Sequence, residues 1–162
     1  MAYRLSGRQA PLCDIFSLHP YGESPDESPL ASHGSTVGFA DHLRLTAALK
    51  AAFRDTPQPQ PPVLYSEYGV DSQVPPDKRH LYSGLPATRP AESRQAEYYR
   101  QAFVLAACQP GVLGVILFLI RDEPQLERWQ SGLYYPDGSA KSSLPSVRQA
   151  MLDASSGNIA CG

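Results

Sequence analysis

The sequence lacks both a membrane-spanning apolar stretch and an excess of basic charge. Its longest apolar run, Val112 to Ile120, is nine residues long and contains Gly114, whereas a transmembrane helix needs about 20. The 162 residues carry a formal net charge of -2, and the Lys and Arg residues are scattered along the chain. Because nucleic acids and anionic lipids attract clustered positive charge, neither a nucleic acid nor a membrane is expected as a partner.

Metal-binding patterns are also missing. The chain has three cysteines, and none of them forms a CxxC pair, which argues against a zinc site and against a thioredoxin-like redox motif. His33, His42 and His80 show no metal-ligand spacing and are expected at the surface. A Gly-x-Ser-x-Gly sequence, typical of the esterase nucleophile, is absent as well. We therefore expect no metal, no cofactor and no esterase activity.

Three strand-like apolar runs are present and predict an α/β fold. They are Leu12 to Leu18, the run that begins at Val63, and Val112 to Ile120. Each run is followed by a loop rich in Pro, Gly or Ser and then by a helical pattern. Alternation of strands and helices implies a parallel sheet with helices packed against it. The composition, 42% hydrophobic and 19% charged, fits one globular domain.

Three helices are expected between and after these strands. Leu45, Leu49 and Phe53 recur at helical spacing, and a cluster of prolines from Pro57 to Pro62 ends that helix. A second helix has Pro90 near its first turn and stops at Gln109-Pro110-Gly111. Pro145 opens a third, short helix that runs to about Leu152, with Gly157 past its end. The loops Gly22 to Gly38 and Val70 to Ala91 are long.

Polar side chains follow the ends of all three strands. Glu67 ends the second run, His19 and Tyr21 follow the first, and Arg121 and Asp122 follow the third. Ligands of parallel sheets bind at the carboxyl ends of the strands, so these side chains are expected to share one rim. Arg121 and Asp122 could instead form only a local ion pair. The chain therefore reads as part of an enzyme, with Glu67 as its most informative residue.

The ordered motifs resemble the carboxyl-terminal part of a clan A glycoside hydrolase, the cellulase-like retaining TIM-barrel group. Asp14 through Tyr21 resembles the sixth strand, Tyr65 through Gly69 the seventh, and Gly132 through Lys141 the loop after the eighth. The resemblance implies a partial (β/α)8 barrel made of about the last three βα units. Residues 1–162 would then be a single fragment of a glycoside hydrolase catalytic domain.

The resemblance also implies roles for individual residues. The glutamate that matches Glu67 is the nucleophile of this family, and the residues that match His19 and Tyr21 lie beside the scissile sugar. Retaining hydrolysis uses one carboxylate to attack the anomeric carbon and a second, about 5 to 5.5 Å away, to protonate the leaving oxygen. Tyr68 and Trp129 are candidates for stacking on sugar rings, although Trp129 can equally be a loop anchor. Asp122 either binds a sugar hydroxyl or has a structural role.

One departure from the family pattern is important. The family's acid/base glutamate follows an asparagine at the end of the fourth strand, and this chain has no Asn-Glu pair; Asn158 is its one asparagine. The second carboxylate is therefore expected from elsewhere, such as the missing amino-terminal half of the barrel, and the chain alone should be nearly inert. Three parallel strands would also leave bare edges and uncovered apolar surface, which predicts poor solubility or association.

Two expectations concern the substrate and the cellular compartment. The resemblance implies an oligo- or polysaccharide substrate and an extracellular location for the full-length parent, although residues 1–11 show no secretory signal. Cys108 and Cys161 are expected near the same face of a barrel, so they form either a disulfide or a free, buried pair. The alternative to a glycosidase is a non-catalytic carbohydrate-binding or scaffold protein of the same fold.

Overall fold

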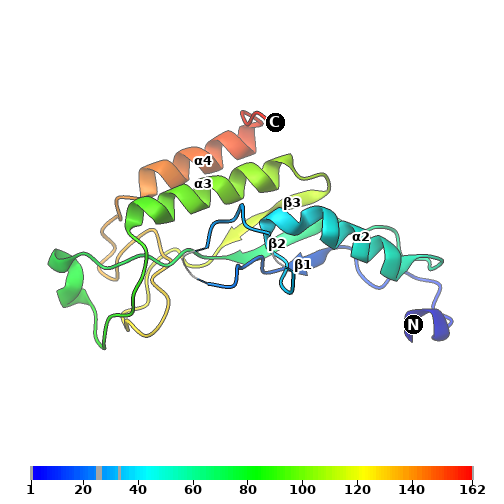
Figure 1. The fold of residues 1–162 in the computed structure, drawn as a ribbon, viewed down its shortest axis with the longest axis horizontal. Helices are drawn as coiled ribbons and strands as arrows, with labels where there is room; N and C mark the ends of the chain where they lie inside the picture. The colour runs from blue at the N-terminus through cyan, green and yellow to red at the C-terminus, as the bar shows by residue number, and fades with distance from the viewer. Residues whose placement is uncertain (1, 25–26, 33, 162) are drawn as a thin grey trace.

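The computed structural model describes residues 2–24, 27–32 and 34–161. Its centre is a three-stranded parallel sheet in the order β1-β2-β3, formed by Phe16–Leu18, Val63–Tyr68 and Val112–Leu117 (Figure 1). Leu18, the last residue of β1, pairs in parallel with Tyr65 of β2, so the residues that follow β1 run beside the last residues of β2. The prediction of an α/β fold with a parallel sheet is confirmed.

The first and third strands are shorter than the apolar runs that predicted them. β1 begins only at Phe16, because the backbone N–H groups of Leu12 and Cys13 donate to the side-chain Oε1 of Gln58, at 2.6 and 3.1 Å, instead of to a neighbouring strand. β3 ends at Leu117, so the predicted extension to Ile120 is wrong. The central strand β2 matches its predicted position.

The three predicted helices are present as α2 (His42–Phe53), α3 (Glu92–Cys108) and α4 (Leu144–Ser156). The last helix is one turn longer than predicted, and it ends where Gly157 adopts a left-handed conformation (φ 73°) that favours glycine. Three short helices were not predicted: α1 (Ala2–Leu5), η1 (Phe39–Asp41) and η2 (Pro76–Leu81). None of the helices in the described ranges is long and apolar enough to cross a bilayer.

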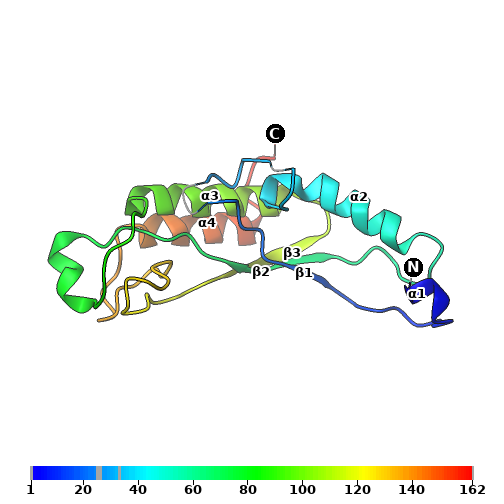
Figure 2. The ribbon, with the colours of Figure 1, turned by 60° about the horizontal axis from the view of Figure 1, so that its bottom comes forward.

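All three long helices lie on the same side of the sheet (Figure 2). The core between the helices and the sheet contains Phe39, Val63, Tyr65 and Tyr99, which are at most 1% exposed. Leu113 of β3, which is 56% exposed, lines a hollow together with Phe103 of α3 and Met151 of α4. On the other side of the sheet, Ile116 of β3 remains 52% exposed. The apolar side chains of this bare face have no layer to cover them within the described residues, as the sequence predicted.

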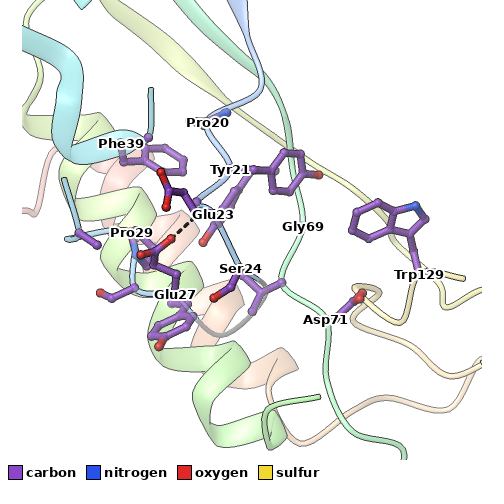
Figure 3. Close-up of a pocket in the computed structure, with 17 residues that line it drawn as sticks. Pro20, Tyr21, Glu23, Ser24, Glu27, Pro29, Phe39, Gly69, Asp71 and Trp129 are labelled. Carbon is purple, nitrogen blue, oxygen red and sulfur yellow. Dashed lines mark hydrogen bonds between the residues drawn. The ribbon is translucent and has the colours of Figure 1, made fainter. Parts of the chain in front are cut away.

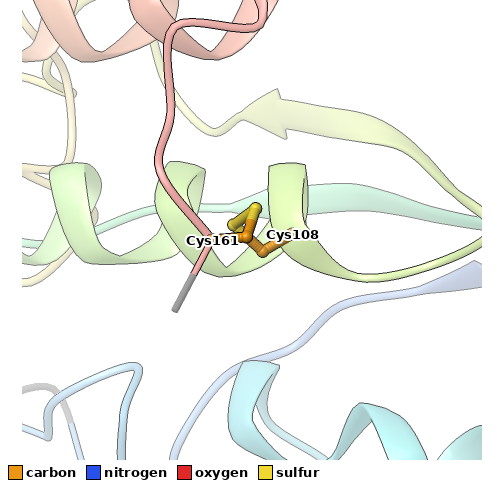
Figure 4. The surroundings of a disulfide bond; sticks show 2 residues. All are labelled: Cys108 and Cys161. Carbon is orange, nitrogen blue, oxygen red and sulfur yellow. A yellow bond between two sulfur atoms is a disulfide. The ribbon is translucent and has the colours of Figure 1, made fainter.

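A disulfide joins the end of α3 to the carboxyl-terminal tail. Cys108 and Cys161 are bonded, with their Cα atoms 5.4 Å apart (Figure 4). Of the two alternatives that the sequence left open, the structure has the bridge. Cys13 is a free, partly buried cysteine. The bridge fixes the segment after α4 against the helix that packs on the sheet.

One expectation about the histidines is wrong. His42 is only 4% exposed, because it starts α2 at the point where this helix meets the chain between α3 and β3. Its Nε2 lies 3.1 Å from the carbonyl oxygen of Pro110, and its Nδ1 lies 3.4 Å from the hydroxyl of Tyr65. His80 is exposed, as expected. His33 lies outside the described residues.

Candidate functional site

The structure brings Glu67, near the carboxyl end of β2, together with His19 and Tyr21, which follow β1. The hydroxyl of Tyr21 donates to Oε1 of Glu67 at 3.0 Å, and Nδ1 of His19 lies 3.8 Å from the same oxygen. This contact follows from the parallel register, because residues that come after two paired parallel strands emerge at the same edge of the sheet. The three residues predicted from the first and second strands therefore form one cluster.

Tyr21 is held in the state that can donate to Glu67. Partial burial raises the pKa of the Tyr21 hydroxyl far above its ordinary value of 10, and its hydrogen bond to Glu67 and the charge of Glu67 add to this shift. The phenol therefore stays protonated at neutral pH. The Glu67 side chain is 27% exposed and that of His19 is 53% exposed, so a ligand from solvent can reach the carboxylate.

Aromatic rings extend the cluster on the side of Tyr21. The rings of Tyr21 and Trp129 are stacked with their centroids 6.1 Å apart, and Phe118 meets Trp129 edge-on at 5.6 Å. Trp129 is 43% exposed, so part of its indole is accessible beside Tyr21. Two rings thus anchor Trp129, and part of its own ring is still accessible to a ligand. The structure agrees with both roles that the sequence allowed, a loop anchor and a sugar-stacking ring.

Tyr68 is placed differently from a sugar-stacking platform. It is only 5% exposed, and its ring packs edge-on against Phe39 at 4.8 Å and Tyr99 at 5.8 Å. Tyr21 lies 5.9 Å from its ring. Because the aromatic core surrounds it, Tyr68 supports the ring of Tyr21 from behind and has little surface left for a ligand.

Asp122 belongs to a buried network and does not join the Glu67 cluster in any contact that the structure shows. Its Oδ1 lies 2.8 Å from Nζ of Lys141 and accepts from the backbone N–H of Gly132 at 2.9 Å, while the hydroxyl of Tyr82 donates to Oδ2 at 2.6 Å. The local ion pair with Arg121 is therefore not formed; Arg121 is exposed. These contacts favour the structural role of Asp122 over sugar binding.

Lys141 completes this network, although no sequence pattern singles it out as buried. Its Nζ donates to Oγ of Ser72 and to the carbonyl oxygen of Gln130, both at 2.8 Å. Burial raises the pKa of Asp122 and lowers that of Lys141, while their mutual attraction opposes both shifts. The pair ties together the connections that follow β2 and β3. No local pattern indicates it, because its members are far apart in the sequence.

A cavity of about 190 Å³ lies beside the cluster (Figure 3). The Gly22–Gly38 loop and the residues after β2 form most of its wall, and Tyr21 and Trp129 line it too. Glu67 is not part of the lining, so Tyr21 connects the cavity to the carboxylate through its hydroxyl. The sequence of this loop predicts only a long connection, because no motif in it indicates a binding site.

A metal site needs several ligating side chains placed close together. Within the described ranges, no group of three or more His, Cys, Asp or Glu side chains is placed to hold a metal ion. The chemistry available at the cluster is thus that of an accessible carboxylate with a tyrosine donor and a nearby imidazole. Such a carboxylate can act as a nucleophile or bind hydroxyl groups.

Comparisons with known proteins give a fold but no family. No protein-family model matches the chain, and no curated protein matches it either. A family 39 glycoside hydrolase from the gut symbiont Bacteroides cellulosilyticus WH2 is similar in structure, with a TM-score of 0.56 and 22% identity over 88% of this chain and 27% of that chain. The β-glucuronidase of Ruminococcus gnavus has a TM-score of 0.52 and 17% identity over 87% and 23% of the two chains.

A β-glucuronidase from Lactobacillus rhamnosus gives a similar result, with a TM-score of 0.51 and 15% identity over 85% of this chain and 22% of that chain. The chain spans about a quarter of the length of these enzymes. At such identities the likeness concerns the fold alone. The three-stranded parallel sheet with its helices thus has the fold of a part of known glycoside hydrolases.

Proposed function

We propose that this chain is the part of a retaining O-glycosyl hydrolase, of the clan A cellulase-like type, that carries the nucleophile Glu67. The observation that supports this most directly is the hydrogen bond from Tyr21 to Glu67 at the carboxyl ends of adjacent parallel strands. Active sites of β/α barrels lie at this end of the sheet. The fold shared with part of known glycoside hydrolases is the second support.

The proposed chemistry assigns a role to each member of the cluster. Glu67 attacks the anomeric carbon of a β-linked glycan and forms a covalent glycosyl-enzyme intermediate, while the glycosidic C–O bond breaks and the acid/base carboxylic acid of the parent protonates the leaving oxygen; water then hydrolyses the intermediate. The hydroxyl of Tyr21 orients the Glu67 carboxylate by donating a hydrogen bond to Oε1. The other carboxylate oxygen, Oε2, is then the one that attacks. His19 lies close enough to contact the same sugar. Trp129 offers its exposed surface to a neighbouring sugar ring.

The proposal includes the position of the chain in a complete barrel. Residues 1–162 would be one fragment of the catalytic domain, with β1, β2 and β3 as strands six, seven and eight. Five further βα units would supply the acid/base carboxylate about 5 to 5.5 Å from Glu67. We also propose an extracellular location for the full-length parent, and the Cys108–Cys161 disulfide supports it, because such bonds persist in oxidising compartments.

A mechanism-based trap tests the role of Glu67. A 2-fluoro glycoside incubated with the full-length parent should leave its sugar covalently attached to Glu67, because the fluorine slows hydrolysis of the intermediate more than its formation. Peptide mass spectrometry locates the label. The Glu67→Gln variant should take up no label, whereas Glu97→Gln, which changes an exposed carboxylate on α3, should be labelled normally. A label on another residue would contradict the proposal.

The alternative is a non-catalytic carbohydrate-binding or scaffold protein of the same fold. The sequence favours it in one respect, namely the absence of an Asn-Glu pair that could supply the acid. Under this alternative the parent would bind oligosaccharides without cleaving them, and Glu67→Gln would leave that binding unchanged. Calorimetric titration together with product analysis by chromatography distinguishes the two functions.

A further inference from the structure

A second, smaller cavity with a basic lining is formed by the connections that follow β2 and β3. Arg79 and Arg89 both line it, and the described residues of its wall include no aspartate and no glutamate. Its volume is about 70 Å³, whereas an enclosed water needs about 10 to 15 Å³. The space therefore accommodates one small group and is too small for a sugar ring.

The guanidinium group of Arg89 has hydrogen-bonding capacity that the protein does not use. The side chain is only 20% exposed, and its Nε lies 2.9 Å from Oδ2 of Asp71. This contact is an ion pair without hydrogen-bond geometry, since the buried Nε has no hydrogen-bond partner within the described residues. The two Nη groups have no acceptor there either. Polar groups shielded from water are normally hydrogen-bonded, so these donors indicate a ligand that accepts from them.

Ser72 contributes a second donor to the same lining. It is 1% exposed, and its Oγ accepts a hydrogen bond from Nζ of Lys141 at 2.8 Å. Because an ammonium group can only donate, the proton of the Ser72 hydroxyl is directed to another acceptor. No acceptor in the described part of the chain takes this proton. A hydroxyl donor and a guanidinium group thus line one small space.

Arg79 adds a positive charge that is fixed in position. Its Nη1 and Nη2 donate to the carbonyl oxygens of Tyr82 and Gly84, at 2.8 and 2.6 Å, so little side-chain freedom is lost when a ligand binds. A hydrogen bond from the backbone N–H of Leu85 and, more weakly, the charge of Arg79 lower the pKa of Glu127. Glu127 does not line the cavity, so a ligand inside would meet the arginine and not this carboxylate.

We propose that this cavity binds one tetrahedral oxyanion, a sulfate or phosphate group, which accepts hydrogen bonds from Arg89 and Ser72 and is attracted by the charge of Arg79. The planar guanidinium group matches such oxyanions because two of its N–H groups can donate in parallel. The anion is either a free inorganic ion or a substituent of a larger ligand, since the same donors recognise both. The site does not depend on the proposed glycosidase function.

Titration of the 162-residue chain with inorganic sulfate and with inorganic phosphate tests the proposal. At neutral pH, with the ionic strength held constant by sodium chloride, either anion should shift the NMR signals of the Ser72 amide and the Arg89 side chain. The dissociation constant should be about 1 mM or lower. The midpoint of thermal unfolding should rise as well, because the unfolded chain lacks the site. Equal shifts with sodium chloride alone, or no shift with either anion, would overturn the proposal.

Matched variants locate the effect. Arg89→Lys keeps a positive charge beside Asp71 but removes the two Nη donors, so it should weaken anion binding about tenfold without a large loss of stability. Arg89→Gln should weaken binding further. Arg94→Gln changes an arginine of α3 that is 53% exposed, and it should leave the affinity unchanged. An unchanged affinity in Arg89→Lys would overturn the assignment to this cavity, and this variant decides if Arg89→Gln fails to fold.

Sugar esters distinguish the two sources of the anion. Glucose 6-phosphate and glucose 6-sulfate carry the same groups on a sugar. If they bind more tightly than the inorganic ions, the natural ligand carries the anion as a substituent; if they bind more weakly, the ligand is a free ion, and both results uphold the site. Glucose itself should not shift the Ser72 and Arg89 signals, and binding of glucose as tight as that of its esters would contradict recognition of the charge.

The outcomes are independent of those for the nucleophile. Covalent labelling of Glu67 in the parent, without anion binding at Arg89, would uphold the glycosidase and overturn the anion site. Anion binding that depends on Arg89, without labelling of Glu67, would uphold the anion site and leave the glycosidase unsupported.

Discussion

At the scale of single residues, the buried pair of Lys141 and Asp122 has the largest energetic consequence. Both side chains are fully shielded from solvent, and the hydrogen-bonding partners of the pair come from both the connection after β2 (Ser72 and Tyr82) and the connection after β3 (Gln130 and Gly132). Removing both charges from water is costly, and the compensating contacts exist only in the folded state. Loss of one partner would therefore leave an uncompensated charge in the interior.

Lys141→Met should lower the free energy of unfolding by about 3 to 5 kcal/mol, the usual cost of breaking a buried ion pair. Chemical denaturation followed by circular dichroism measures this loss. Lys78→Met makes the same chemical change at a pair with Asp137 that is partly exposed, and it should have a much smaller effect. Adding Asp122→Asn to Lys141→Met should restore part of the stability, because no unpaired charge then remains in the interior and the amide oxygen still accepts from one of the two donors, the backbone N–H of Gly132 or the hydroxyl of Tyr82.

The position of a residue could be predicted where it lies at the end of a strand. It could not be predicted where it depends on contacts with residues far away in the sequence. His19, Tyr21 and Glu67 could be grouped because parallel strands end at one edge of a sheet. The burial of His42 could not be foreseen, because it depends on the approach of Pro110 and Tyr65 to the start of α2. The cavity beside Tyr21 also escaped prediction, since the conformation of the Gly22–Gly38 loop, not a sequence pattern, forms most of its wall.

At the scale of secondary-structure elements, the disulfide attaches the segment after α4 to the end of α3. The three long helices could be predicted from apolar spacing and proline positions, whereas the pairing of Cys108 with Cys161 stayed open. The bond closes a loop with a sequence separation of 53 residues that contains β3 and α4. Cross-links that close long loops restrict the unfolded chain strongly.

A Cys108→Ser/Cys161→Ser variant should lose about 2 to 4 kcal/mol of unfolding free energy, because its unfolded chain regains the freedom that the bridge removes. Thermal unfolding under non-reducing conditions measures the change. Cys13→Ser alters a cysteine that forms no bridge and should leave the midpoint nearly unchanged. If a reducing agent shifted the double variant as much as it shifts the unmodified protein, the bridge would not be the cause.

At the scale of the whole molecule, the helices cover one face of the sheet and leave the other bare. β1 and β3 each pair only with β2 within the described residues, so both outer edges have free backbone groups. Leu113 and Ile116 expose apolar surface next to the β3 edge. Edges and apolar faces of this kind promote association of sheets.

The isolated chain should therefore self-associate, and Ile116→Lys should weaken this association roughly tenfold or more, because a charge replaces apolar area that would be buried between the copies. Sedimentation velocity over a concentration series gives the dissociation constant. Leu43→Lys introduces the same charge at a residue of α2 that is 79% exposed, and it should leave the association unchanged. A monomer at all concentrations would contradict this prediction.

The central position of β2 has a consequence for biosynthesis. β1 is made first, but its hydrogen-bonding partner is β2, which leaves the ribosome only after α2 and the proline-rich segment that follows it. Among the described residues before Val63, β1 thus has no strand to pair with, so the β1–β2 edge can form only after β2 has been synthesised. Apolar segments that wait for a partner in this way stay exposed during translation, the stage at which chaperones bind nascent chains.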